Sequence, residues 1–197
     1  ILDTDNTITL HYEAEADSAT PVNLTNHTYF NLNTPAAENG MYVSALNHWV
    51  KIYSSQYVET DSSLIPTGQL LPVENTAFDF RMGKTLIAVF DALENGYDDT
   101  WLLDHRIAGS IPLAAIVREP NTGRELHIFS TQPALTMYTA NFLQNDNGKN
   151  GYVYGKHSAI CFETQHIPNS PNRNGFPSTI ITPDKKYYHK TLWHFKV

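Results

Sequence analysis

The chain has 197 residues, of which 41% are hydrophobic, 12% aromatic and 17% charged, and its formal net charge is −7. This length suits one domain or a large part of one, and the acidic balance argues against a nucleic-acid partner, which requires a basic surface. No apolar run approaches the roughly 18 residues of a membrane span. The single cysteine, Cys161, excludes an internal disulfide and favours a reducing, cytoplasmic compartment.

Hydrophobic periodicity predicts many short strands and one helix. Residues 7–14 (TITLHYEA) alternate apolar and polar side chains, as a half-buried strand does. Apolar residues at helical spacing predict a helix over residues 85–93, and the turn cluster at 120–123 predicts a hairpin. Turns are expected at 17–20 and 62–68, and loops at 33–40 and 144–156. The predicted strands, in chain order, are residues 7–14, 21–32, 49–58, 70–73, 113–118, 125–131, 135–140, 159–165 and 187–197.

Short strands separated by turns rich in glycine, proline and asparagine are typical of an all-β protein. This pattern favours an antiparallel β-sandwich or barrel. No internal repeat or domain linker is evident in the sequence.

The strand predicted at residues 159–165 carries a carboxylate in its middle. Because side chains alternate along a strand, Glu163 shares one face with Cys161 and Gln165. A carboxylate in such a place is costly to bury unless it has a partner or a function. The alternative is an edge strand whose glutamate points into water.

The strand predicted at residues 21–32 (PVNLTNHTYFNL) has a polar face around one imidazole. Asn23, Thr25, His27 and Tyr29 fall on that face. Such a row of hydrogen-bonding groups suits the hydroxyls of a sugar. The alternative is a solvent-facing strand with a structural histidine.

Four segments, in order VNLTNHTYFNL, GYDDTWLL, STQPALTMYTANF and FETQHIPNSPN, resemble the aldose 1-epimerase (galactose mutarotase) family. The resemblance runs from about residue 7 to residue 195. It implies a large β-sandwich of two wide, curved sheets, of which residues 1–197 would be the C-terminal portion. The family pattern includes a second histidine and an arginine further upstream, so an N-terminal part of the same protein is the expected partner of this chain.

The resemblance also implies a reaction, the interconversion of the α and β anomers of a hexose such as glucose or galactose. Opening the hemiacetal needs a base for the anomeric hydroxyl and an acid for the ring oxygen. Matched position by position, Glu163 is the base and His27 the acid. No cofactor is required.

Substrate contacts are implied at four further positions. Asp98 matches the acidic residue that holds sugar hydroxyls, and Gln132 matches a substrate-contacting glutamine. Thr28 and Tyr29 would line the site beside the imidazole. Asp99 departs from the family pattern, which commonly has histidine there, and the alternative is that both aspartates are turn residues after the helix.

Other chemistries have weaker support. The nine histidines are scattered without a Cys/His cluster, so no metal site is predicted. Two alternative functions remain: a non-catalytic carbohydrate-binding β-sandwich, and an epimerase-like protein acting on sugar phosphates. The second would need a basic residue at the site, for which Arg81 and Arg173 are the candidates.

Overall fold

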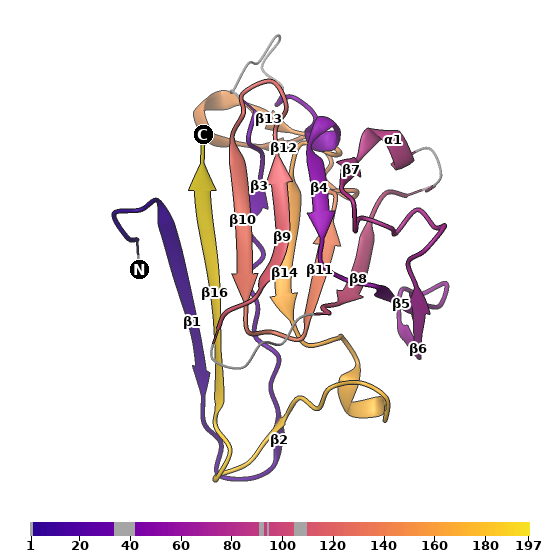
Figure 1. Cartoon of the computed structure of the whole chain (residues 1–197), viewed down its shortest axis with the longest axis vertical. Coiled ribbons are helices and arrows are strands. Elements are labelled where there is room, and N and C mark those ends of the chain that lie inside the picture. Colours follow the sequence, from indigo (N-terminus) through magenta and orange to yellow (C-terminus); the bar gives the residue numbers. More distant parts are fainter. Residues whose placement is uncertain (1, 34–41, 91–92, 94, 105–109) are drawn as a thin grey trace.

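Two six-stranded antiparallel sheets dominate the fold in the computed structural model, which describes residues 2–33, 42–90, 93, 95–104 and 110–197 (Figure 1). The first sheet contains, in spatial order, β1 (Thr7–Ala14), β16 (Tyr187–Lys196), β10 (Glu125–Ser130), β9 (Leu113–Arg118), β4 (Trp49–Ile52) and β7 (Lys84–Thr85). The second contains β3 (Tyr29–Phe30), β14 (Ile160–Gln165), β11 (Ala134–Tyr138), β8 (Asp98–Leu102), β5 (Gln56–Thr60) and β6 (Pro66–Pro72). This arrangement confirms the predicted all-β antiparallel sandwich.

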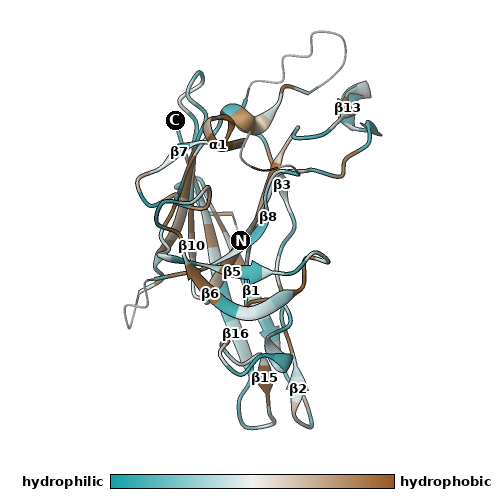
Figure 2. Cartoon of the chain, turned by 90° about the vertical axis from the view of Figure 1, so that its right-hand side faces the viewer, coloured by the Kyte–Doolittle hydropathy of each residue, from teal (hydrophilic) through white to brown (hydrophobic). Residues whose placement is uncertain are grey.

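Smaller elements surround the two sheets. A two-stranded pair, β2 (Thr20–Pro21) with β15 (Ile180–Ile181), projects beyond the lower end of the sandwich (Figure 2). A second pair joins β12 (Asp146–Asn147) to β13 (Val153–Tyr154). The described helices are one turn of α-helix, α1 (Ile87–Phe90), and 3₁₀ turns at Ala45–Asn47, Lys149–Gly151 and Ser170–Asn172. No helix in the described ranges is long and apolar enough to cross a membrane.

The main core lies between the sheets, which Figure 2 shows edge-on as two layers. Each sheet contributes alternate side chains to this core, as the pleat requires. The first sheet supplies Val50, Ile128 and Trp193 among others, and the second supplies Trp101, Leu135 and Phe162. On the second sheet, the residues that alternate with these core residues point away from the first sheet. We call the surface that they form the outer face.

Several predicted elements are confirmed almost to the residue. Strand β1 spans the predicted residues 7–14, β9 and β10 pair as the predicted hairpin, and β16 fills the predicted closing strand. The strand predicted at 159–165 is β14. These are long, cleanly patterned segments bounded by strong turn residues.

The single strand predicted at residues 49–58 is wrong. It is two strands, β4 and β5, which belong to different sheets. The chain breaks at Ser54 and Ser55, whose side chains hydrogen bond to Leu102 O and to the Asp104 carboxylate in place of a continuous ladder. Short polar side chains of this kind compete with strand pairing for backbone partners.

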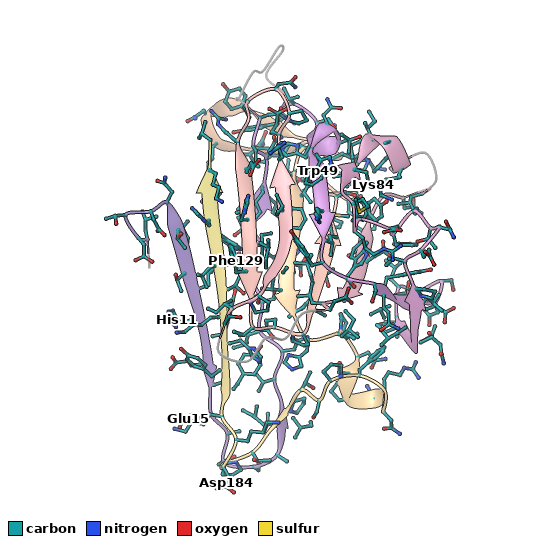
Figure 3. The ribbon with its side chains drawn as sticks, in the orientation of Figure 1. His11, Glu15, Trp49, Lys84, Phe129 and Asp184 are labelled. Carbon is teal, nitrogen blue, oxygen red and sulfur yellow. The ribbon has the colours of Figure 1, made fainter. Side chains whose placement is uncertain are left out.

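The helix predicted at residues 85–93 is shorter at its start, because Lys84 and Thr85 pair with β4 as β7. Residues 91, 92 and 94 lie outside the described part of the chain. Trp49 and Lys84, labelled in Figure 3, mark this edge of the first sheet. Gly83 precedes β7 with φ +75°, and a Cβ atom there would lie 1.8 Å from the Trp49 ring, so the turn requires glycine.

Three other predictions need correction or fall outside the described residues. The turn predicted at 62–68 is shorter, because β6 begins at Pro66. The strand predicted at 70–73 is the second half of β6, which ends at Pro72. The loop predicted at 144–156 contains the β12–β13 hairpin. Most of the loop predicted at 33–40 lies outside the described residues.

Candidate active site

The segment that carries His27 is not the strand that the sequence predicted. Residues 22–28 run between β2 and β3 without strand pairing in the structure. The physical reason is that side chains take the place of the ladder. The Asn23 amide donates to His166 O and accepts from His166 N–H, both at 2.9 Å, and the Thr25 hydroxyl donates to Thr164 O at 3.0 Å.

This path brings His27 to the outer face of β14. His27 Nε2 lies 3.4 Å from Glu163 Oε1, and the side chains are 49% and 12% exposed respectively. The imidazole also contacts two aromatic rings, with centroid distances of 5.0 Å to Tyr29 and 5.9 Å to Tyr138. The two residues predicted as acid and base are therefore adjacent, although they are far apart in sequence.

Glu163 is not an edge residue in water. Its strand lies between β3 and β11, and Glu163 pairs in register with Thr136 of β11. Burial raises the pKa of the Glu163 carboxyl above its usual value of 4.5, an effect that nearby His27 opposes and Asp98 reinforces. The ordinary alternative of a solvated glutamate is wrong for this structure.

Asp98 begins β8, so the alternative that it is a turn residue after the helix is also wrong. Tyr138 of β11 pairs with Asp98 on one side and with Cys161 of β14 on the other, and Cys161 pairs in turn with Tyr29. These four residues form one row across the outer face. Burial raises the pKa of Asp98, and His27 opposes the shift.

Asp99 points the other way, into the sandwich. Burial raises its pKa to about 6, and the charge of Asp98 adds to the shift, while a hydrogen bond from the Asp98 N–H opposes it. Burial, with a smaller contribution from the Asp99 carboxylate, raises the pKa values of Tyr57 and Tyr97. The residue that departs from the family pattern is therefore directed away from the candidate site.

A second polar row on the outer face was not singled out from the sequence. Thr100 and Thr136 hydroxyls lie 2.7 Å apart, and the Gln165 amide donates to Thr136 Oγ1 at 2.9 Å. Thr136 stands opposite Glu163. The predicted strand at 135–140 held the signal, because alternation along it puts Thr136 and Tyr138 on one face.

Gln132 lies in the bend before β11, and among the described residues it makes no hydrogen bond to Glu163. Its Oε1 lies 3.1 Å from Nδ1 of His166. Its side chain is buried, and its amide donates to Leu24 O at 3.2 Å and to Tyr187 Oη at 2.7 Å. A contact between Gln132 and a sugar stays a prediction, and the geometry favours a role in holding Leu24.

Thr28 and Tyr29 follow His27 directly, and the Tyr29 ring contacts the imidazole. The Thr28 hydroxyl donates to Asn26 Oδ1. Both residues line a cavity of about 490 Å³, whose further lining includes Tyr42 and Tyr154. Within the described ranges, no group of three or more His, Cys, Asp or Glu side chains is placed to hold a metal ion.

Known proteins resemble this chain in both sequence and fold. The aldose 1-epimerase family profile matches residues 1–194. The galactose mutarotase of Homo sapiens is 41% identical over 193 residues, and the match covers 95% of this chain and 54% of the human protein. The aldose 1-epimerase of Escherichia coli K12 is 32% identical over 198 residues, covering 97% of this chain and 55% of the bacterial one.

The solved structure of an aldose epimerase homologue from C. elegans superimposes with a TM-score of 0.85 at 27% identity, covering 98% of this chain and 57% of that one. The chain thus spans about half the length of the curated relatives it matches. Profile, sequence identity and fold agree over nearly all of its residues, and the chain belongs to the aldose 1-epimerase family.

Proposed function

We propose that this chain carries the acid–base pair of an aldose 1-epimerase that interconverts the α and β anomers of a hexose such as galactose or glucose. The observation that supports this most directly is the contact of 3.4 Å between His27 Nε2 and Glu163 Oε1 on the outer face of β14. Relatives named galactose mutarotase and aldose 1-epimerase support the same activity.

In the proposed reaction, the Glu163 carboxylate takes the proton of the anomeric hydroxyl while His27 gives a proton to the ring oxygen. The bond between the anomeric carbon and the ring oxygen breaks, and the open-chain aldehyde rotates. Reclosure on the other face of the carbonyl returns both protons and yields the other anomer. Acid–base catalysis of this kind contributes about 10²–10⁴-fold.

The electrostatics of Glu163 suit the role of base. Burial raises its pKa, so the carboxylate, when ionised, is a stronger base than that of an exposed glutamate. Asp98, partly buried in the same outer face, is proposed to accept hydrogen bonds from sugar hydroxyls. Thr28, Tyr29 and Gln132 are proposed as further substrate contacts, of which Gln132 has the least geometric support.

The sugar-phosphate alternative has little support from its two candidate cations. Arg81 is paired with Asp79 at 2.8 Å and lies 3.8 Å from Glu74. Arg173 donates through Nε to Pro66 O at 3.0 Å. Neither guanidinium contacts the His27–Glu163 pair. A purely sugar-binding protein would have no need of the imidazole–carboxylate contact, which favours catalysis.

We further propose that residues 1–197 form the C-terminal portion of one sandwich domain in a cytoplasmic enzyme. The basis is the share of about half that the chain occupies in its relatives, together with the single buried thiol of Cys161. The rest of the domain would then add the second histidine and the arginine of the family pattern. Expressed alone, the 197-residue chain is expected to give far less activity than the full-length gene product.

The test is polarimetry on the full-length gene product. Freshly dissolved α-galactose and α-glucose should reach anomeric equilibrium faster with enzyme, and galactose 6-phosphate should not. Exhaustive dialysis against EDTA should leave the rate unchanged. Faster equilibration of the phosphate alone would favour the sugar-phosphate function, binding of galactose without turnover would favour the binding protein, and zinc-dependent recovery after EDTA would contradict the cofactor-free mechanism.

A further inference from the structure

The segment that holds His27 has little backbone support of its own. Strand β2 ends at Pro21 and β3 begins at Tyr29, and residues 22–28 between them make no strand pairing in the structure. The imidazole is half exposed. Something other than a ladder must keep it within reach of Glu163.

Two side chains fasten this segment to the backbone that carries the carboxylate. Asn23 pairs with both the N–H and the C=O of His166, as a neighbouring strand would. Thr25 donates to the C=O of Thr164, the residue that follows Glu163. Both anchor points lie within three residues of the proposed base.

The opposite side of the same segment is held by a third set of bonds. The Tyr187 hydroxyl accepts from Leu24 N–H at 3.3 Å, and the Gln132 amide donates to Leu24 O at 3.2 Å. Gln132 also donates to the Tyr187 hydroxyl at 2.7 Å. Leu24 is therefore fixed between β16 and the start of β11, while its two neighbours are fixed to β14.

We propose that Asn23 and Thr25 are positioning residues that set the separation of His27 and Glu163 in the epimerase reaction. This inference rests on the proposed function. Each side chain hydrogen bonds to the backbone of β14 or of the residue after it. Their loss therefore changes the placement of the acid relative to the base and leaves the substrate-binding surface intact.

This role predicts a particular kinetic pattern. Small displacements of a catalytic group lower the chemical rate steeply, so Thr25→Val should lower kcat about tenfold and leave KM within about twofold. Asn23→Ala removes two hydrogen bonds and should lower kcat further. Thr25→Ser keeps the hydroxyl and should restore kcat to within about twofold of the wild type.

A matched control removes the same kind of bond elsewhere. The Thr76 hydroxyl donates to Val73 O at 2.6 Å and accepts from Phe78 N–H at 3.1 Å in the turn after β6, outside the His27 segment. Thr76→Val should leave kcat and KM within about twofold of the wild type. If it lowered kcat as much as Thr25→Val does, the effect would be one of general stability and the inference would be overturned.

Hydrogen exchange gives a readout that does not depend on activity. The Leu24 and His166 amides, which donate to the Tyr187 hydroxyl and to the Asn23 side chain, should exchange about tenfold faster in Asn23→Ala and Thr25→Val, and at the wild-type rate in Thr76→Val. Unchanged exchange in both variants would overturn the proposed anchoring.

The kinetics separate the two proposals. A full-length protein that binds galactose without epimerising it would overturn the proposed function, and with it any positioning for that reaction. A protein whose activity falls in Glu163→Gln but whose kcat is unchanged in both Asn23→Ala and Thr25→Val would overturn the positioning role alone. Higher KM with unchanged kcat in these variants would likewise overturn it.

Discussion

The proposed acid and base stand on supports of opposite kinds. Glu163 lies in a regular strand that pairs with β11 from Cys161 to Gln165, and its side chain is largely buried. His27 lies on a segment held by side chains, and its imidazole is half exposed. The base thus has a fixed, desolvated setting that raises its pKa, whereas the acid keeps access to solvent.

This contrast assigns different jobs to the two supports. Strand pairing fixes the position of the Glu163 carboxylate, and burial in that position determines how strongly the carboxylate binds a proton. The side-chain bonds of Asn23 and Thr25 fix only how far the imidazole lies from it. Changes to β14 should therefore act on the chemistry itself, and changes around His27 on its geometry.

The largest expected effect is at the fixed support. Glu163→Gln keeps the shape and removes the base, so the rate of anomerisation should fall by about 10²-fold or more. Polarimetry with α-galactose measures this. Near-normal turnover in the variant would show that Glu163 is not the base of the reaction.

A smaller loss is expected at the exposed support. His27→Asn should lower kcat by about tenfold or more, less than Glu163→Gln does, because water can partly replace a half-exposed acid. Binding of galactose, measured by calorimetry, should largely survive. If binding and turnover fell together in a folded variant, His27 would be a binding residue.

A substitution at Asp98 tests whether this residue binds the sugar or takes part in the acid–base chemistry. Asp98→Asn should raise KM about five- to tenfold and change kcat less, because a neutral amide is a weaker acceptor for hydroxyls than a carboxylate. Steady-state polarimetry over a range of galactose concentrations gives both constants. A fall in kcat alone would place Asp98 with the acid–base pair.

The smallest effect concerns Asp99, on the inner side of the same strand as Asp98. Its folded-state pKa is raised from 3.8 to about 6, so its contribution to stability is fully present below the lower value and is lost as pH rises through 6. Asp99→Asn should raise the free energy of unfolding by on the order of 1 kcal/mol at pH 7.5. It should also flatten the dependence of stability on pH between the two pKa values.

Urea denaturation across pH 4 to 8 checks this, with the exposed Asp5→Asn as control. A variant less stable than the wild type at pH 7.5 would mean that the Asp99 carboxylate has a stabilising partner in the interior. The pH dependence of Asp5→Asn should follow that of the wild type.

Much of the fold could be predicted because its strands are marked locally. The alternating pattern of residues 7–14 and the turn between β9 and β10 depend only on neighbours in sequence. The division of residues 49–58 between two sheets could not be predicted, since it depends on Ser54 and Ser55 bonding to Leu102 and Asp104 about 50 residues away.

For the candidate site, the residue types and their alternation indicated which side chains share a face. The sequence did not indicate the path that the chain takes between its strands. Glu163 was placed on the correct face of a correct strand, because alternation within β14 determines it. The path of residues 22–28 was wrong, because Asn23 and Thr25 bond to a segment about 140 residues further along the chain. The contribution of Thr136 became evident only from its register against Glu163.

The placement of β16 has a consequence for the order in which the chain can fold. Among the described residues, β16 lies between β1 and β10, so the edge of β1 that faces β16 is paired by a segment about 180 residues further along the chain. During synthesis on the ribosome, that edge stays open until Tyr187–Lys196 has left the exit tunnel. Pairing of such distant segments slows folding and leaves strand edges exposed to other chains meanwhile.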